Sequence, residues 1–221
     1  MMESRTDREP GRVDEARRPS IHRKVTSIVL AGVGGQGSVL ATRIVATAAE
    51  LAGHDVVTSE VHGMSQRGGT VTTTVRYGDE VLSSAVPAGE ADLLVAFERL
   101  EAARHMDMLA PGGVVLVNDQ RIAPSIEALK RTAYPTDLDR RARDRGVSVQ
   151  MYPALRLARD LGNEKLASTV MLGALANYLF LDRALWKEAI RRTVPPRTIE
   201  ANEVAFDTGE EWLVGAPAFS F

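Results

Sequence analysis

The stretch KVTSIVLAGVGGQG, residues Lys24 to Gly37, decides the fold of this chain. Its apolar, β-favouring run Ile28–Ala31 leads into a cluster of glycines, and an apolar, helix-forming stretch follows at Val39–Leu51. The glycines are Gly32, Gly34, Gly35 and Gly37. This order predicts a strand, a glycine-rich turn and a helix, which together open a nucleotide-type α/β domain. Because glycine has no Cβ, the turn can be tight and can admit a ligand or a strand, and the helix N-terminus favours an anion there.

The glycine spacing has more than one interpretation. Gly32, Gly34 and Gly37 fit the dinucleotide pattern G-x-G-x-x-G, and Glu60 ends the next strand-like run, where it would hold the ribose of NAD. A phosphate-binding Walker loop fits less well, since Ser38 stands where that motif needs lysine. A tight strand-to-helix turn without a ligand is the third interpretation, so the glycines alone do not decide the function.

Length, composition and charge are those of an ordinary globular protein. The 221 residues suffice for one α/β domain with a core, and 44% hydrophobic and 25% charged residues are usual values. A net charge of -2 and a pI near 6.1 give no overall attraction to nucleic acid or to an anionic membrane. We therefore expect neither nucleic acid nor a membrane as a partner.

The chain has no cysteine, which excludes several kinds of site within it. It cannot form a disulfide, a thiol nucleophile, or a zinc or iron–sulfur site with cysteine ligands. Its four histidines are scattered, with no pair at the spacing of metal ligands on a helix. We expect no metal site in this chain.

Two segments bear on localisation and domain organisation. The longest apolar window, Ala167–Leu181, contains polar residues and is shorter than the ~20 residues that a membrane span needs. It predicts a buried helix. Met1–Lys24 is charged, carries prolines and glycine and has no apolar signal-peptide region, so we expect a disordered tail on a cytoplasmic protein. Residues 25–221 are then expected to form a single domain.

The rest of the chain predicts a Rossmann-like, mostly parallel sheet with an inserted β-hairpin and a helical C-terminal region. A second strand is expected at Asp55–Glu60, and a hairpin at Thr70–Val86 replaces the next crossover helix. Continuous apolar runs predict buried strands at Ala91–Phe97 and Val114–Asn118, with a short strand at Val147–Met151. Helices are predicted at Leu100–Leu109, Ser125–Arg131, Leu138–Asp144, Pro153–Leu161, Glu164–Phe180, Arg183–Val194 and Arg197–Phe206.

The segment EVHGMSQRGG, Glu60 to Gly69, is the second informative stretch. It follows the second predicted strand, so it is expected at the carboxyl edge of the sheet beside the first glycine turn, where open α/β sheets bind ligands. Its hydrogen-bonding and cationic side chains and its glycines suit a phosphate site, and equally a rigid loop that docks onto another chain. An irregular loop without either role is the third interpretation. The residues concerned are His62, Ser65, Gln66, Arg67, Gly68 and Gly69.

Other polar residues have plainer interpretations. No acidic or nucleophilic partner for His62 is recognisable, so a hydrogen-bonding role is expected of it rather than acid–base catalysis. Glu98 and Glu101 suit the N-terminus of the helix that follows a buried strand. Asn118 and Asp119 end the next strand at the same edge and are candidates to line a cleft.

Together these motifs resemble the γ-type domain of 2-oxoacid:ferredoxin oxidoreductases, over nearly all of Val25–Gly209. The wording HGMSQRGG most resembles the β subunit of the indolepyruvate:ferredoxin oxidoreductases. The matching residues are Gly32–Gly37, Glu60–Gly69, Ala91-Asp92, Phe97-Glu98, Glu101-Ala102, Val170–Leu175, Trp186, Ala189-Ile190, Glu200–Asn202, Ala205-Phe206 and Gly209.

The resemblance implies a subunit of an enzyme that oxidatively decarboxylates an aryl 2-oxoacid with coenzyme A (CoA) and ferredoxin. Thiamine diphosphate with Mg and the [4Fe-4S] clusters would lie in a large partner α subunit, and this chain would carry no catalytic residue of its own. It would complete the complex and the substrate and CoA cleft, with the Gly32–Gly37 turn (including Gln36) and the segment from His62 to Gly69 as the candidate contacts.

Three alternatives stay open from the sequence. The complex could act on another 2-oxoacid, the chain could be a free-standing NAD-binding Rossmann reductase, or it could be a scaffold with an empty glycine turn. The hairpin after Glu60 argues against the reductase, because it replaces the second crossover unit of a dinucleotide domain.

Overall fold

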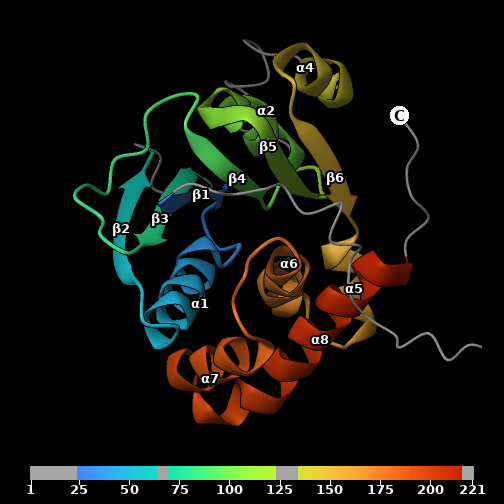
Figure 1. Ribbon diagram of the computed structural model, residues 1–221. Coiled ribbons are helices and arrows are strands. Elements are labelled where there is room, and N and C mark those ends of the chain that lie inside the picture. The colour runs from blue at the N-terminus through green and yellow to red at the C-terminus, as the bar shows by residue number, and fades with distance from the viewer. Residues whose placement is uncertain (1–23, 64–68, 123–133, 216–221) are drawn as a thin grey trace, which may run out of the picture.

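The structure is a computed structural model, described over residues 24–63, 69–122 and 134–215 (Figure 1). The predicted tail, apart from Lys24, and the helix predicted at Ser125–Arg131 lie outside the described residues. The strands are β1 (Val25–Val33), β2 (Asp55–His62), β3 (Thr70–Gly78), β4 (Ala91–Ala96), β5 (Leu109–Asn118) and β6 (Ser148–Tyr152). The α-helices are α1 (Ser38–Leu51), α2 (Arg99–His105), α4 (Leu138–Arg145), α5 (Ala154–Asp160), α6 (Ala167–Ala176), α7 (Arg183–Thr193) and α8 (Ile199–Gly215). Short 3₁₀ turns are η2 (Met106–Met108), η3 (Glu164–Leu166) and η4 (Pro196–Thr198).

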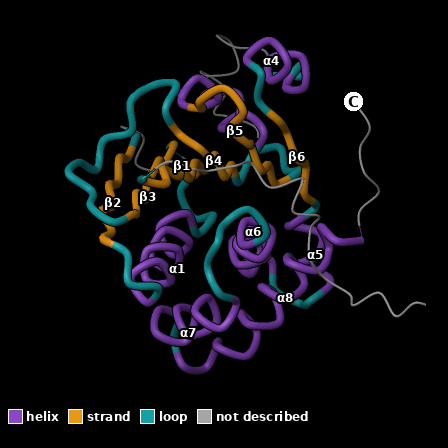
Figure 2. The backbone as a smooth tube through the Cα atoms, viewed as in Figure 1, coloured by secondary structure: helices purple, strands orange, loops and turns teal. Residues whose placement is uncertain are grey.

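The six strands form one sheet in the order β2-β3-β1-β4-β5-β6 (Figure 2). The ladders β1–β4, β4–β5 and β5–β6 are parallel, whereas β3 is antiparallel to both β1 and β2. Five strands therefore point the same way and β3 alone is reversed. This confirms the predicted α/β fold with a mostly parallel sheet. It also places the carboxyl ends of β1, β4 and β5 side by side.

The hairpin predicted at Thr70–Val86 is wrong, because its second strand does not form and β3 pairs antiparallel with β2 instead. β3 pairs with the whole length of β2, from His62↔Val71 to Asp55↔Gly78, and Val81–Val86 forms no strand. Both edges of β3 are already occupied by β1 and β2, so no edge is left for a strand at Val81–Val86. That segment instead crosses the face of β3, where Arg76 donates to the carbonyls of Ser83 and Ala85 at 2.9 and 2.8 Å.

Helices cover the two faces of the sheet unequally (Figure 1). Alternate residues of β1 face opposite sides: Ile28 and Leu30 belong to a large core with α1, α5, α6, α7 and α8, and Val29 and Ala31 to a smaller one with α2 and α4. This alternation follows from the two-residue period of a strand. The first helix begins directly after Gly37 and ends at Leu51, just before Gly53, as predicted.

Several predicted boundaries differ from the structure. The helix predicted at Arg197–Phe206 runs from Ile199 to Gly215, and the strand predicted from Val114 begins at Leu109. Two further differences have identifiable reasons. The helix predicted to run to Leu109 ends at His105 and η2, because Leu109 already pairs with Ala91 and opens β5. The helix predicted to run to Phe180 ends at Ala176. There the side-chain amide of Asn177 donates to the Gly173 carbonyl and to the Glu210 carbonyl of α8, at 3.3 and 3.2 Å.

Helices α6 and α8 pack closely. A Cβ added to Gly173 of α6 would lie 2.0 Å from the Phe206 carbonyl oxygen of α8, and one added to Gly209 would lie 1.9 Å from the Val170 carbonyl oxygen. Both glycines therefore allow the backbones of α6 and α8 to approach each other. In the described part of the chain, no helix is long and apolar enough to cross a membrane.

Candidate functional site

The glycine turn lies where β1 passes into α1, and the side chain of Gln36 folds back across it. Gln36 Oε1 accepts a hydrogen bond from the Val33 backbone N–H at 2.7 Å, and Nε2 donates to the Phe97 carbonyl at 2.9 Å. A Cβ on Gly32 would lie 3.1 Å from Gln36 Oε1 and 3.2 Å from the Phe97 ring. Gly32 therefore makes room for protein atoms rather than for a ligand.

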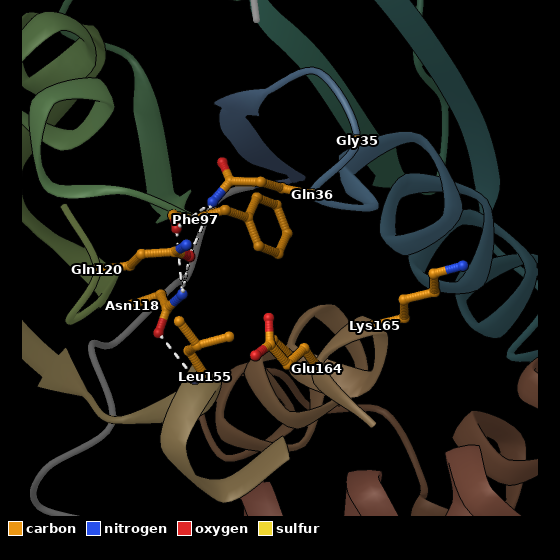
Figure 3. A pocket seen from close by; sticks show the side chains of 9 residues that line it. Gly35, Gln36, Phe97, Asn118, Gln120, Leu155, Glu164 and Lys165 are labelled. Carbon is orange, nitrogen blue, oxygen red and sulfur yellow. Dashed lines mark hydrogen bonds between the residues drawn. The ribbon is translucent and has the colours of Figure 1, made fainter. Parts of the chain in front are cut away.

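Three carboxamides meet at the carboxyl ends of β1, β4 and β5 (Figure 3). Asn118 Nδ2 donates to the Phe97 carbonyl at 3.2 Å, the atom that Gln36 also contacts. The Oε1 of Gln120 accepts from both Gln36 and Asn118, each at 3.1 Å. Asn118 Oδ1 accepts from the Leu155 N–H at the start of α5, at 3.2 Å. These bonds tie three strand ends and one helix into a fixed polar wall.

A pocket of about 190 Å³ opens between this wall and the start of α6. Figure 3 shows Gln36, Asn118 and Gln120 around Phe97 on one side, with Glu164 and Lys165 on the other. The complete lining is Gly35, Gln36, Phe97, Asn118, Gln120, Leu155, Glu164, Lys165 and Ala167. Pockets for complete small-molecule ligands usually measure ~300–1,000 Å³. This one has room for part of a ligand.

The charge at the mouth of the pocket suits an anion. Helix α1 starts there, and its N-cap Gly37 provides no side-chain cap, while no acidic residue lies in its first turn. The first N–H groups of a helix have no partner within the helix and carry partial positive charge. Lys165 is exposed, and among the described residues its ammonium makes no ion pair. Glu164 carries the opposite charge, but its carboxylate binds Arg159 at 2.7 Å.

The second predicted segment meets the first, as expected. The Gly34 N–H donates to the Gly69 carbonyl at 3.0 Å, and the Gly63 N–H donates to the Thr70 carbonyl at 2.8 Å. His62 is exposed, and its Nε2 lies 2.9 Å from Glu60 Oε1, so it is paired outside the pocket. The predicted site residues Ser65, Gln66, Arg67 and Gly68 lie outside the described residues.

The geometry argues against the NAD interpretation of these glycines. Glu60 lies on β2, and β3 separates β2 from β1. In a dinucleotide fold the ribose-binding acid ends the strand next to β1. Gly37 also has a packing role, since an added Cβ would lie 2.7 Å from Ser168 Oγ of α6. The pattern G-x-G-x-x-G is present, but β2, the strand that carries Glu60, does not lie next to β1.

Glu98 and Glu101 lie at the start of α2, as predicted. Glu98 is buried and caps the helix, accepting from the Leu100 and Glu101 N–H groups at 2.7 and 3.2 Å. Its other oxygen accepts from the Ile122 N–H at 3.3 Å and from the hydroxyl of Tyr134. Burial of the hydroxyl is the main cause that raises the pKa of Tyr134, and the hydrogen bond to Glu98 raises it further.

Asn118 lines the pocket, as the sequence indicated, whereas Asp119 pairs with Arg99 and does not. Phe97, Gln120 and Lys165 were not among the predicted site residues. Gln120 could have been found by its place two residues beyond a predicted strand end. Lys165 carries no local signal, because it reaches the site only through the packing of α6 against α1.

The structure brings together no set of metal ligands in the part of the chain that it describes. The chain has no cysteine, and the described residues contain no group of three histidine or acidic side chains that could hold a metal ion. An iron–sulfur cluster would need thiolates from another polypeptide.

Known proteins resemble this chain over most of its length. The family model for pyruvate ferredoxin/flavodoxin oxidoreductase matches residues 27–212. Indolepyruvate oxidoreductase subunit IorB of Thermococcus kodakarensis is 40% identical over 192 residues, which cover 84% of this chain and 95% of that protein. The corresponding IorB of Pyrococcus horikoshii is 38% identical over 191 residues, with coverages of 84% and 95%. The crystal structure of a keto/oxoacid ferredoxin oxidoreductase gamma subunit from Geobacter sulfurreducens superposes with a TM-score of 0.65 at 27% identity. It covers 86% of this chain and 99% of that one.

Proposed function

Because this chain belongs to the pyruvate ferredoxin/flavodoxin oxidoreductase family, we propose that it is the small subunit of an indolepyruvate-type 2-oxoacid:ferredoxin oxidoreductase. The complex would convert an aryl 2-oxoacid, CoA and oxidised ferredoxin into an acyl-CoA, carbon dioxide and reduced ferredoxin. The observation that carries the proposal is the 40% identity to an IorB subunit across 95% of that subunit.

The chemistry would be divided between two polypeptides. Thiamine diphosphate with its Mg ion and the [4Fe-4S] clusters would lie in a large partner subunit, which passes electrons to ferredoxin. The absence of cysteine from this chain supports that division. This chain would contribute a wall of the cleft through which the 2-oxoacid and CoA reach the thiamine.

For the CoA contact, the Gly32–Gly37 turn and the pocket beside it are the candidate site. A phosphate of CoA would take the ammonium of Lys165, which borders the pocket, and the N-terminal N–H groups of α1, which begins two residues after the pocket residue Gln36, since both favour an anion. The amide nitrogen of Gln120 would add a donor, because the oxygen of the same side chain already accepts from Gln36 and Asn118. Arg67 and its neighbours Ser65, Gln66 and Gly68 stay sequence-based candidates for the same role.

The first experiment tests the assembly. An affinity-tagged full-length chain isolated from its native cells should retain a large polypeptide that contains iron and thiamine diphosphate. A chain that elutes alone from gel filtration at every stage of purification would contradict the proposal.

The second experiment tests the CoA contact in the reconstituted complex. Lys165→Gln should raise the apparent KM for CoA about fivefold, since a charge-assisted hydrogen bond contributes ~1.5–3 kcal/mol before solvent exposure reduces it. Arg145→Gln removes an equally exposed cation at the end of α4, on the opposite face of the sheet, and should leave KM unchanged. Equal KM values for the two variants would contradict the contact. Arg67→Ala applies the same test to the sequence-based candidate.

Competition between substrates distinguishes the proposed indolepyruvate-type complex from a complex of the same family that acts on another 2-oxoacid. An indolepyruvate-type complex should prefer aryl 2-oxoacids over pyruvate and 2-oxoglutarate by kcat/KM. The reverse preference would keep the chain in the family but assign it to another 2-oxoacid.

A further inference from the structure

Glu101 is a buried carboxylate that takes no part in the pocket. It is 1% exposed and holds the third position of α2, after the capping residue Glu98. A glutamate at this position commonly reaches back to the N–H of the capping residue. The side chain of Glu101 turns toward β3 instead. Its Oε1 accepts from Thr70 Oγ1 at 3.2 Å and from Arg104 Nη1 at 2.6 Å.

The second oxygen of this carboxylate is unsatisfied. Within the described residues, Glu101 Oε2 accepts no hydrogen bond, and His105 Nδ1 lies 3.7 Å from it. That nitrogen is 3.0 Å from the Glu101 carbonyl oxygen, which can only accept, so Nδ1 carries a hydrogen. His105 Nε2 meets Thr72 Oγ1 at 2.9 Å. A buried carboxylate with an unbonded oxygen costs stability, which indicates a role other than holding α2 together.

Thr70 connects this carboxylate to the glycine turn. Thr70 begins β3 and pairs with Val33 at the end of β1. One residue earlier, the Gly69 carbonyl accepts from the Gly34 N–H at 3.0 Å, which extends the β1–β3 ladder past its last strand pair. Gly34 is followed by Gly35, which lines the pocket. A bond that fixes Thr70 therefore also fixes the carbonyl that holds the turn.

We propose that Glu101 is a positioning residue, whose carboxylate holds Thr70 so that the Gly69 carbonyl keeps the Gly32–Gly37 turn in place beside the pocket. The charge matters because Arg104 bonds to both Glu101 and Thr70 and closes the cluster. A glutamine at this position would keep an oxygen but would lose the attraction to Arg104. The kinetic consequence of this role rests on the proposed CoA contact, whereas its structural consequence does not.

The structural consequence can be measured in the full-length chain by amide hydrogen exchange at Gly34. Glu101→Gln and Thr70→Val should each speed exchange of the Gly34 amide about tenfold, the effect of losing roughly one net hydrogen bond. Thr70→Ser keeps the hydroxyl and should exchange like the parent chain. Asp119→Asn removes an exposed carboxylate at the same end of α2 and should also leave Gly34 unaffected. Unchanged exchange in Thr70→Val would overturn the proposal, even if Glu101→Gln fails to fold.

The kinetic consequence is measured in the reconstituted complex. Glu101→Gln and Thr70→Val should raise the apparent KM for CoA several-fold with kcat within twofold, and Thr70→Ser should restore the parent value. Faster exchange at Gly34 with an unchanged KM would support the positioning role and contradict the CoA contact. Unchanged exchange would overturn the positioning role, whatever the value of KM.

Discussion

A Cβ on Gly173, where α6 crosses α8, would lie 2.0 Å from a backbone oxygen, whereas a Cβ on Gly35 in the β1–α1 turn would meet no atom within 4 Å. At the crossing, the space that glycine leaves is filled by the backbone of another helix. At Gly35, the corresponding space is open and belongs to the pocket. Glycines that look alike in sequence thus differ in structure: one permits close packing of two helices, and the other leaves open space in a turn beside a pocket. Substitutions can separate the two, because packing changes stability and access changes binding.

The largest expected effect is at the crossing. Gly173→Ala should lower the free energy of unfolding by about 3 kcal/mol, because the new methyl group forces α6 and α8 apart. Urea denaturation of the full-length chain measures this. Ala201→Ser, at an exposed position of α8, is the control and should change it by less than ~0.5 kcal/mol. A loss at Gly173 as small as the control would mean that the helices are not in close contact.

Gly37 lies in the turn but should behave partly like Gly173. Its φ is 84° and an added Cβ would lie 2.7 Å from Ser168 Oγ, so Gly37→Ala should cost about 2 kcal/mol of stability. Ser168→Ala should recover roughly 0.5–1 kcal/mol of that loss in the double variant, since it removes the clashing oxygen. Strict additivity of the two substitutions would contradict the contact between the turn and α6.

Gly35→Ala, unlike Gly173→Ala, should affect binding more than stability. Its φ of 96° disfavours alanine, so unfolding should become easier by about 1 kcal/mol, with no steric clash to add. The apparent KM for CoA in the complex should rise about tenfold, the equivalent of ~1.4 kcal/mol, because the methyl group enters the pocket. An unchanged KM alongside the small stability loss would show that no ligand approaches Gly35.

The smallest effect should come from the ion pairs that join α8 to α7. Burial alone would raise the pKa of Asp207, but its bonds to Lys187 and Arg183 outweigh burial and lower it. A lowered folded-state pKa stabilises the fold above the ordinary value of 3.8, and this stabilisation is lost as the pH falls below it. Asp207→Asn should therefore cost less than ~1 kcal/mol at pH 7, and nothing at pH 2. A larger loss than that of Gly173→Ala would reverse the expected ranking.

Helices and strands were predicted from the sequence more accurately than the pairing of the strands. The strand, turn and helix around Gly32–Gly37 follow from local chemistry and were correctly placed. The pairing of β3 with β2 was not foreseen, because the alternation of Thr70–Arg76 indicates a strand without stating which strand it joins. The identity of the strand next to β1 decides between an NAD site and another use of the same glycines. Strand order depends on contacts between residues far apart in the sequence, so the local sequence does not reveal it.

Some residues of the candidate site could likewise be predicted from local sequence, and others could not. Gln36 and Asn118 were identified because they lie next to a turn and a strand end. Lys165 was not, since it lies in η3, far from the turn in sequence, and borders the pocket through the packing of the C-terminal elements. The proximity of the Glu60–Gly69 segment to the glycine turn was predicted from the shared sheet edge, and the hydrogen bond between Gly34 and Gly69 confirms it. The contact of Gly37 with Ser168 needed the three-dimensional structure.

The most direct test of whether this chain completes an active site on another polypeptide is ferredoxin reduction measured with the two purified subunits, separately and mixed. With an aryl 2-oxoacid and CoA present, only the mixture should reduce ferredoxin, and the small chain alone should show no NAD-dependent turnover. Turnover by the small chain alone with NAD, or full activity of the large subunit without it, would contradict that role.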